Sequence, residues 1–305
     1  MTTRHLLEID DLTPGEIEVV LTLARAPQPA QVLAGSGVAL VFEKPSARTR
    51  NSMEMAVVGL GGHPVTIRPD EVGLDTRETT EDVARTLACY HAVIGARVFE
   101  HSKLERMTAV VDVPVVNMLS DTSHPLQALA DLLTIGDEFG ELAGRSVAYV
   151  GDANNVARSL AIGVLATGGS FRLAHPDGYG FGDEDLARIG AAGDRVDISG
   201  DPARAVEGAD VVYADVWTSM GQEAESARRR ADFAGFGVDD ALMSRAGSGA
   251  VFMHCLPAHR GEEVEASVLE GQASRVWPQA RNRMAAARGV LEFLMEAGAT
   301  VEQRT

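Results

Sequence analysis

Short apolar runs alternate along the chain with apolar residues at helical spacing. The run 38–42 is short and rich in branched side chains, as is typical of a buried strand. Met53, Ala56, Val57 and Leu60 then recur at helical spacing, so a helix is expected to follow that strand. This order repeats through the second half and predicts an α/β fold of two doubly wound parallel-sheet domains joined by interdomain helices. Second-half strands are expected at 146–150, 171–174, 196–199, 211–216 and 251–256, and helices at 155–167, 183–191 and 202–207.

The same sequence patterns predict the domain boundaries and the helices and strands of the first half and the C-terminus. A glycine-containing break at 136–144 marks the boundary between domains predicted at 1–135 and 136–285, and residues 286–305 are expected to pack back on the first domain. Residues 70–77 are polar and acidic, which predicts a mobile loop. Further helices are expected from Pro14 to near Pro27, over 81–90, from Pro125 onward and over 282–297, and further strands at 65–68, 92–98 and 114–119.

The composition limits which binding partners and which cellular compartment are expected for the protein. The 305 residues carry a formal net charge of -17, which argues against nucleic acid as a partner because its phosphates would be repelled. Cys89 and Cys255 are too few for a disulfide framework, so a reducing, cytoplasmic compartment is expected. The acidic N-terminus does not resemble a signal peptide, and no apolar run reaches the ~18 residues of a membrane span.

A cluster of cations and hydroxyls follows the strand at 38–42. Ser46 is a good helix N-cap, which places Arg48, Thr49 and Arg50 in the first turn of the helix, next to Lys44. A helix start presents unpaired N–H groups and the positive end of the dipole. The segment therefore predicts an anion site suited to phosphate, and the alternative is a solvated basic helix start.

Two further features of the first half indicate chemistry. Arg97 ends an apolar strand, where it is expected either to pair with a carboxylate or to donate to a developing oxyanion. Pro125 at a first helical position makes His124 the expected cap. Gln127 lies three residues beyond His124, so the two side chains can point the same way.

In the second half, polar residues follow two predicted strands. The segment 151–155 lacks the second and third glycines of a dinucleotide fingerprint, and its two asparagines suit a carboxylate or amine ligand better. Asp215 is well placed either to bind an ammonium group or to cap a helix. The charged stretch after it is interpreted as a solvated helix, with Glu225 and Arg229 as an i,i+4 pair.

The segment 254–260 contains three potential metal ligands. Its spacing does not fit a structural zinc site, so no metal is predicted. His254 and Cys255 are expected on opposite faces of a strand, which excludes a simple catalytic dyad. Cys255 is interpreted as a polar wall of a site or as a lone buried cysteine.

Taken together and in order, these segments resemble the aspartate/ornithine carbamoyltransferase family over almost the whole chain. The departures are Ala47, where the family usually has threonine, and the stretches 74–77 and 121–123. The motifs that carry the resemblance are 46–50 (Ser-Thr-Arg-Thr type), Arg97, 124–127 (His-Pro-x-Gln), 215–221 (Asp-x-x-x-Ser-Met-Gly), 254–257 (His-Cys-Leu-Pro) and 282–283.

The resemblance implies transfer of a carbamoyl group from carbamoyl phosphate to the side-chain amine of L-ornithine, giving L-citrulline and phosphate. It implies a carbamoyl phosphate domain first, an ornithine domain second, a homotrimer, and no metal or organic cofactor. Other amine acceptors (putrescine, acetylornithine, aspartate) and a non-catalytic phosphate-binding regulatory protein are the alternatives. The direction of metabolism, arginine synthesis or citrulline breakdown, stays open.

The resemblance also implies roles for individual residues. The residues implied to bind carbamoyl phosphate are Ser46, Ala47, Arg48, Thr49, Arg97, His124, Gln127, Cys255, Leu256 and Arg283. Those implied to bind ornithine are Asn155, Asp215, Ser219 and Met220. The catalytic residues are expected to be Arg97, His124, Asp215 and Cys255.

Overall fold

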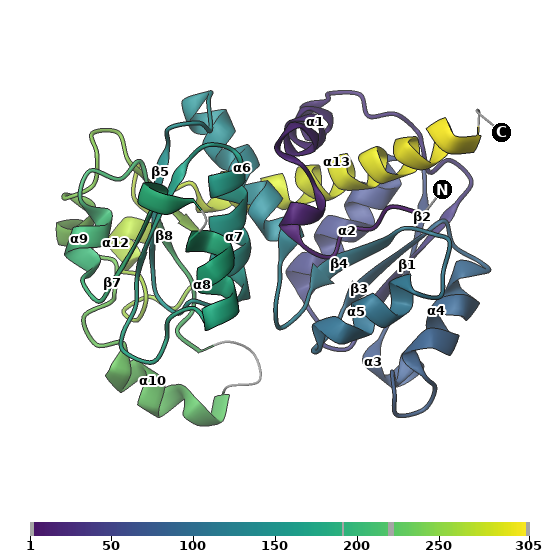
Figure 1. Ribbon diagram of the computed structural model, residues 1–305, viewed down its shortest axis with the longest axis horizontal. Helices are drawn as coiled ribbons and strands as arrows, with labels where there is room; N and C mark the ends of the chain where they lie inside the picture. The colour runs from purple at the N-terminus through teal and green to yellow at the C-terminus, as the bar shows by residue number, and fades with distance from the viewer. Residues whose placement is uncertain (1–2, 191, 219–222, 303–305) are drawn as a thin grey trace. The chain divides into compact units, whose positions relative to one another are not determined.

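The computed structural model describes residues 3–190, 192–218 and 223–302. The chain forms two compact units: Met1–Leu133 with Asn282–Thr305, and Thr134–Arg281. Each unit is built on one parallel sheet with helices packed against it (Figure 1). The predicted α/β class with two parallel sheets is confirmed.

The sheet of the first unit has the strand order β2-β1-β3-β4, and all its pairs are parallel. Apolar side chains from alternate positions of β1 and β3 share one buried cluster with α4 and α5, which cover that face (Figure 1). The strands are β1 Gly37–Phe42, β2 His63–Ile67, β3 Val93–Arg97 and β4 Val115–Leu119. The helices are η1 Ile9–Asp11, α1 Pro14–Arg25, α2 Ala47–Gly59, α3 Pro69–Val72, α4 Thr80–Ala88 and α5 His101–Thr108.

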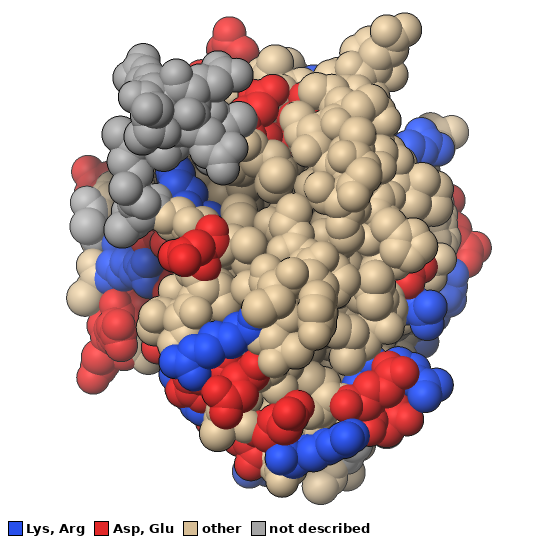
Figure 2. All heavy atoms as spheres, turned by 90° about the vertical axis from the view of Figure 1, so that its right-hand side faces the viewer, with Lys and Arg blue, Asp and Glu red and all other residues tan. Residues whose placement is uncertain are grey.

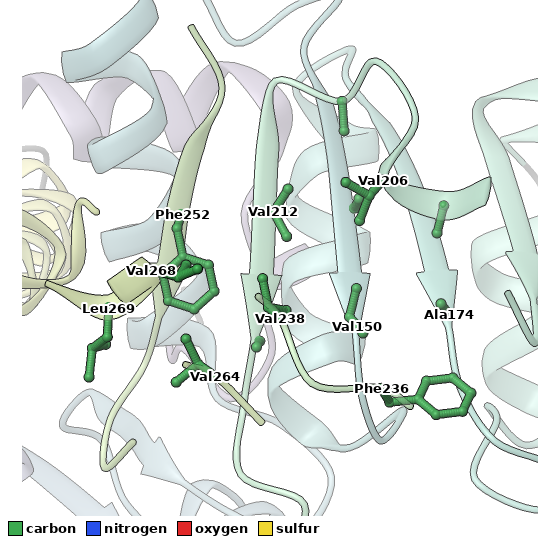
Figure 3. Close-up of a cluster of buried hydrophobic side chains, with 14 of the residues drawn as sticks. Val150, Ala174, Val206, Val212, Phe236, Val238, Phe252, Val264, Val268 and Leu269 are labelled. Atoms are coloured by element: carbon green, nitrogen blue, oxygen red, sulfur yellow. The ribbon is translucent and has the colours of Figure 1, made fainter. Parts of the chain in front are cut away.

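The sheet of the second unit has the order β7-β6-β5-β8-β9, again all parallel. Figure 3 shows Val150, Val212 and Phe252 from three of its strands packed with Val264 and Val268. The strands are β5 Ser146–Val150, β6 Ser170–Ala174, β7 Val196–Ser199, β8 Val211–Ala214 and β9 Val251–His254. The helices are α7 Asn155–Ala166, α8 Asp183–Gly190, η2 Gly193–Arg195, α9 Pro202–Val206, η3 Glu223–Glu225, α10 Ser226–Asp232, α11 Asp240–Met243 and α12 Ala266–Leu269.

Two helices, α6 (Pro125–Phe139) and α13 (Val276–Glu302), contain the boundaries between the units. The sequence predicted the last helix only from residue 282. It begins earlier, at Val276, and Pro278 is tolerated there because a missing N–H in the first turn breaks no helical hydrogen bond. None of the helices within the described part of the chain has the length and apolar character that a bilayer crossing needs.

The loop expected at 70–77 is in part wrong, because α3 occupies its first residues. Pro69 begins this helix, and the Glu71 carboxylate accepts from the Arg68 N–H at 2.7 Å, which caps its start. Glu71, one of the acidic residues that suggested a mobile loop, therefore caps α3. Helix α5 was not predicted, although its buried apolar residues Leu104 and Met107 lie at helical spacing.

Candidate active site

The helix start after β1 has the predicted geometry. Ser46 is the N-cap of α2, and its Oγ accepts from the Thr49 N–H at 3.4 Å. A pocket of about 650 Å³ opens beside this turn, and Ser46, Ala47 and Arg50 are among its lining residues. The Arg50 Nε donates to Glu54 at 2.7 Å, so this guanidinium is paired along its own helix. The exposed first turn therefore has the unpaired N–H groups that an anion site at a helix start needs.

Behind that turn, two arginines converge on one threonine. Thr49 is buried, and its Oγ1 accepts from Arg97 Nη1 at 3.0 Å and from Arg283 Nη2 at 3.4 Å. Arg283 also donates to the Gln127 side-chain oxygen at 2.6 Å. Residues from α2, β3, α6 and α13 thus form one buried polar cluster in the first unit, which brings four predicted site residues together.

The charges in this cluster repel one another. Burial and the neighbouring charges of Arg283 and Arg48 lower the pKa of Arg97 to about 10. Burial, together with Arg283 and Arg97, holds the pKa of His124 well below its usual value, so its imidazole is neutral at pH 7. An anion bound beside these groups would relieve the repulsion, while a neutral imidazole still offers one N–H donor.

In the second unit, the ends of three neighbouring strands meet at Asp215, which follows β8. Its Oδ2 accepts from Asn154 Nδ2 at 2.8 Å, and its Oδ1 accepts from the Cys255 thiol at 2.9 Å and from the Val216 N–H at 2.8 Å. The carboxylate is therefore held by groups that follow β5 and β9 rather than capping a helix. Asn154 also caps α7, and Asn155 begins that helix.

The expected separation of His254 and Cys255 is wrong. Strand β9 ends at His254, so the alternation of faces does not extend to Cys255. Potential ligand atoms of Asp215, His254 and Cys255 all lie within 4.8 Å of one another. The protein itself occupies both imidazole nitrogens: Nε2 lies 3.2 Å from Glu263, and Nδ1 accepts from the Leu256 N–H at 2.9 Å.

Comparison with known proteins matches both units to family models. Residues 4–137 match the carbamoyl-P binding domain of aspartate/ornithine carbamoyltransferase, and residues 143–294 match its Asp/Orn binding domain. The chain belongs to the aspartate/ornithine carbamoyltransferase family. The resemblance inferred from the motifs is confirmed.

Relatives within the family support the same assignment. An ornithine carbamoyltransferase of Acidothermus cellulolyticus is 49% identical, with 96% of this chain and 97% of the relative aligned. One of Thermus thermophilus is 45% identical over the same shares of the two chains. The solved structure of an ornithine carbamoyltransferase from Pyrococcus furiosus superposes with a TM-score of 0.92 at 42% identity, covering 97% of this chain and 98% of that chain.

Several residues near these family motifs were missed or misinterpreted in the sequence. Asp131 accepts from Gln127 Nε2 at 2.7 Å and so orients the amide; its i,i+4 spacing on one helix was the available signal. Arg229, predicted to be solvated, is buried and donates to Asp152 at 2.6 Å and to the Trp217 carbonyl at 2.9 Å. Burial raises the pKa of Asp152, although Arg229 opposes the rise. Ser219 and Met220 lie outside the described residues.

Proposed function

We propose that the protein transfers the carbamoyl group of carbamoyl phosphate to the side-chain amine of L-ornithine, giving L-citrulline and phosphate. The observation that carries this proposal is the buried cluster in which Arg97 and Arg283 both donate to Thr49. Its cations and neutral donors suit a phosphate dianion attached to a carbonyl group. The relatives named ornithine carbamoyltransferase support ornithine as the acceptor.

The phosphate is assigned to the start of α2. Ser46, Arg48 and Thr49 would donate from this turn, with Arg283 donating from α13. Ala47 has no hydroxyl, so its contribution is the backbone N–H of the first helical residue. Charge-assisted bonds of this kind are about twice as strong as neutral ones, so these donors suit a phosphate leaving group.

The carbonyl oxygen is assigned to Arg97, His124 and Thr49. Negative charge grows on this oxygen as the amine attacks, and donors held in a buried site stabilise it most in the transition state. The Gln127 amide would orient the carbamoyl NH2 group. Both substrates react directly, so no covalent enzyme intermediate is needed.

The amine is assigned to Asp215 and Cys255, with Asn155, Ser219 and Met220 positioning the amino acid and Leu256 near the carbamoyl group. A free alkylammonium has a pKa of about 10.4, so roughly one molecule in 2,500 is neutral at pH 7, a cost of about 4.6 kcal/mol. The site must therefore select or generate the neutral amine. A carboxylate that already accepts from a thiol is suited to take up a proton or to orient the amine.

The test is citrulline formation by the purified protein, with ornithine, putrescine, aspartate and acetylornithine offered as competing acceptors. We expect carbamoylation of ornithine in preference to the other three. Preference for another acceptor would assign a different carbamoyltransferase activity. No product with any acceptor, together with binding of phosphate, would favour the regulatory alternative.

We also propose that the protein is a cytoplasmic homotrimer acting in arginine biosynthesis. Helix α2 exposes Met55 and Val58, which are 54% and 51% exposed, and Figure 2 shows one face with a broad area free of charged side chains. Apolar side chains exposed together on one helix, as Met55 and Val58 are, are typical of protein–protein interaction sites. A relative from Pyrococcus furiosus is named as the anabolic enzyme. Sedimentation equilibrium would contradict the trimer if it returned a mass of 32.3 kDa.

A further inference from the structure

The carboxylate of Glu43, the first residue after β1, bridges two strand ends of the first unit. Its Oε1 accepts from Lys103 Nζ at 2.7 Å, and its Oε2 accepts from the Phe99 N–H at 2.8 Å. The Glu43 N–H donates in turn to the Arg97 carbonyl at 2.9 Å. Glu43 is thus bonded to the backbone on both sides of Val98.

The bridge is shielded from solvent. The side chains of Lys103 and Glu43 are 10% and 11% exposed, so this ion pair is far less screened than a surface pair. Glu100 lies 3.7 Å from the same ammonium, but its own side chain is 68% exposed. Within the described residues, Glu43 is therefore the buried anion of this pair.

The sheet around Arg97 is regular on one side only. Arg97 pairs regularly with Phe42 of β1, but the register with β4 shifts between Ala96 and Arg97. Such irregularities bend a strand and re-aim the side chains next to them. The hydrogen bond from the Phe99 N–H to the Glu43 carboxylate lies just beyond the register shift. There it can fix the direction in which the Arg97 side chain points.

We propose that Glu43 is a positioning residue for Arg97, holding the backbone at Phe99 so that the guanidinium stays aimed at Thr49. The proposal rests on the function proposed above, in which Arg97 faces the developing oxyanion. Misplacing a reacting or stabilising group by about 1 Å can cost roughly 10²-fold in rate. A second residue that fixes the direction of the Arg97 guanidinium prevents such a loss. The Lys103 ammonium, 2.7 Å from Oε1, holds the Glu43 carboxylate in place.

Two double variants separate the effect of the hydrogen-bond acceptor at position 43 from the effect of the ion pair. Glu43→Gln with Lys103→Met removes both charges but leaves an oxygen to accept from the Phe99 N–H. Glu43→Leu with Lys103→Met removes the same charges and that acceptor. Neither variant leaves a buried charge unpaired, so both avoid the penalty of breaking half of an ion pair.

We expect the Leu/Met variant to lose roughly 10- to 100-fold in kcat with little change in the KM for carbamoyl phosphate. The Gln/Met variant should retain most of the wild-type kcat. Equal kcat in both variants, whether high or low, would overturn the proposal, and so would a rise in KM alone. If Leu/Met does not fold, Glu43→Ala with Lys103→Met takes its place, since it lacks the same acceptor without adding bulk.

The wild-type protein is measured first. If it forms no citrulline, the proposed function fails and these variants say nothing against the bridge. If it is active and the Leu/Met variant matches it in kcat, only the positioning role fails.

Discussion

Arg97 is a buried cation whose neighbours are the Thr49 hydroxyl and other arginines. Its Nη1 donates to Thr49, while burial and the charges of Arg283 and Arg48 lower its pKa to about 10. It nevertheless remains protonated at neutral pH. A buried cation at the end of a strand is costly, and the proposed anionic transition state explains why it is retained there.

Replacing Arg97 by alanine should lower kcat by about 10²–10³ while the protein stays folded, because one donor to the oxyanion is lost. Steady-state citrulline formation measures the loss, and circular dichroism checks the fold. Arg4→Ala is the matched control, since Arg4 forms an ion pair with Glu16 in the same unit. Activity close to wild type in Arg97→Ala would make Arg97 structural.

His124 should make the protein less stable in mild acid. Its pKa is well below the usual value when folded and about 6.5 when unfolded, so the unfolded chain takes up the proton first. The free energy of unfolding therefore falls as pH drops below about 6.5. Urea unfolding followed by circular dichroism at pH 7.5 and 5.5 measures this slope.

The His124→Gln variant isolates the contribution of His124, because His5 and His91 also have pKa values lowered by burial and act in the same direction. We expect a smaller loss of stability on acidification in this variant than in wild type. An identical pH dependence in the two proteins would show that His124 is not held neutral.

At the scale of elements, strand ends gather the chemistry. In a parallel sheet the carboxyl ends of neighbouring strands lie at one edge, which is where Asp215 meets the residues after β5 and β9. Helix α10 is tied to the same edge, since Arg229 reaches Asp152 and the Trp217 carbonyl. This link holds the segment after β5 by a charge pair and the segment after β8 by a hydrogen bond to a backbone carbonyl.

Replacing Arg229 by methionine should lower the free energy of unfolding of the second unit by about 3–5 kcal/mol, because Asp152 is left as an unpaired buried carboxylate. Tryptophan fluorescence during urea unfolding reports on this unit, since both tryptophans of the chain, Trp217 and Trp277, belong to it. The double variant with Asp152→Asn should recover much of the loss. A single variant as stable as wild type would rule out this anchoring role.

At the scale of the whole molecule, the net charge of -17 coexists with a cationic cluster in the first unit. A strongly negative net charge favours solubility, whereas a local cluster of cations attracts anions. The two units carry separate polar clusters, one rich in cationic donors and one built around a carboxylate. Two substrates of opposite character, an anionic carbamoyl donor and an amine, fit this division.

Turnover at subsaturating ornithine should rise from pH 7 towards pH 9, because the neutral amine increases about tenfold per pH unit below its pKa of about 10.4. Because the pKa of Arg97 is about 10, its guanidinium stays protonated over this range. Deprotonation of Arg97 therefore does not mask the rise in rate. Initial rates of citrulline formation across this interval give the profile. A flat profile would argue against attack by a free amine.

Features that depend on neighbouring residues in the chain could be predicted from the sequence. Strand and helix order, the Ser46 cap and the helix start at Pro125 all follow from short-range patterns, and each is found in the structure. The motifs also identified the family, because five or six weak signals at the right separations are jointly specific.

Which side chains meet depends on long-range packing and could not be predicted from the sequence. Arg283 reaches Thr49 across 234 residues of sequence, and Cys255 donates to Asp215 across 40. Periodicity carries no information about such partners, and it misplaced Cys255 because it could not show that β9 ends at His254. The pairing depends on how strands are ordered in a sheet and where each one stops, which only the packing of the whole unit fixes.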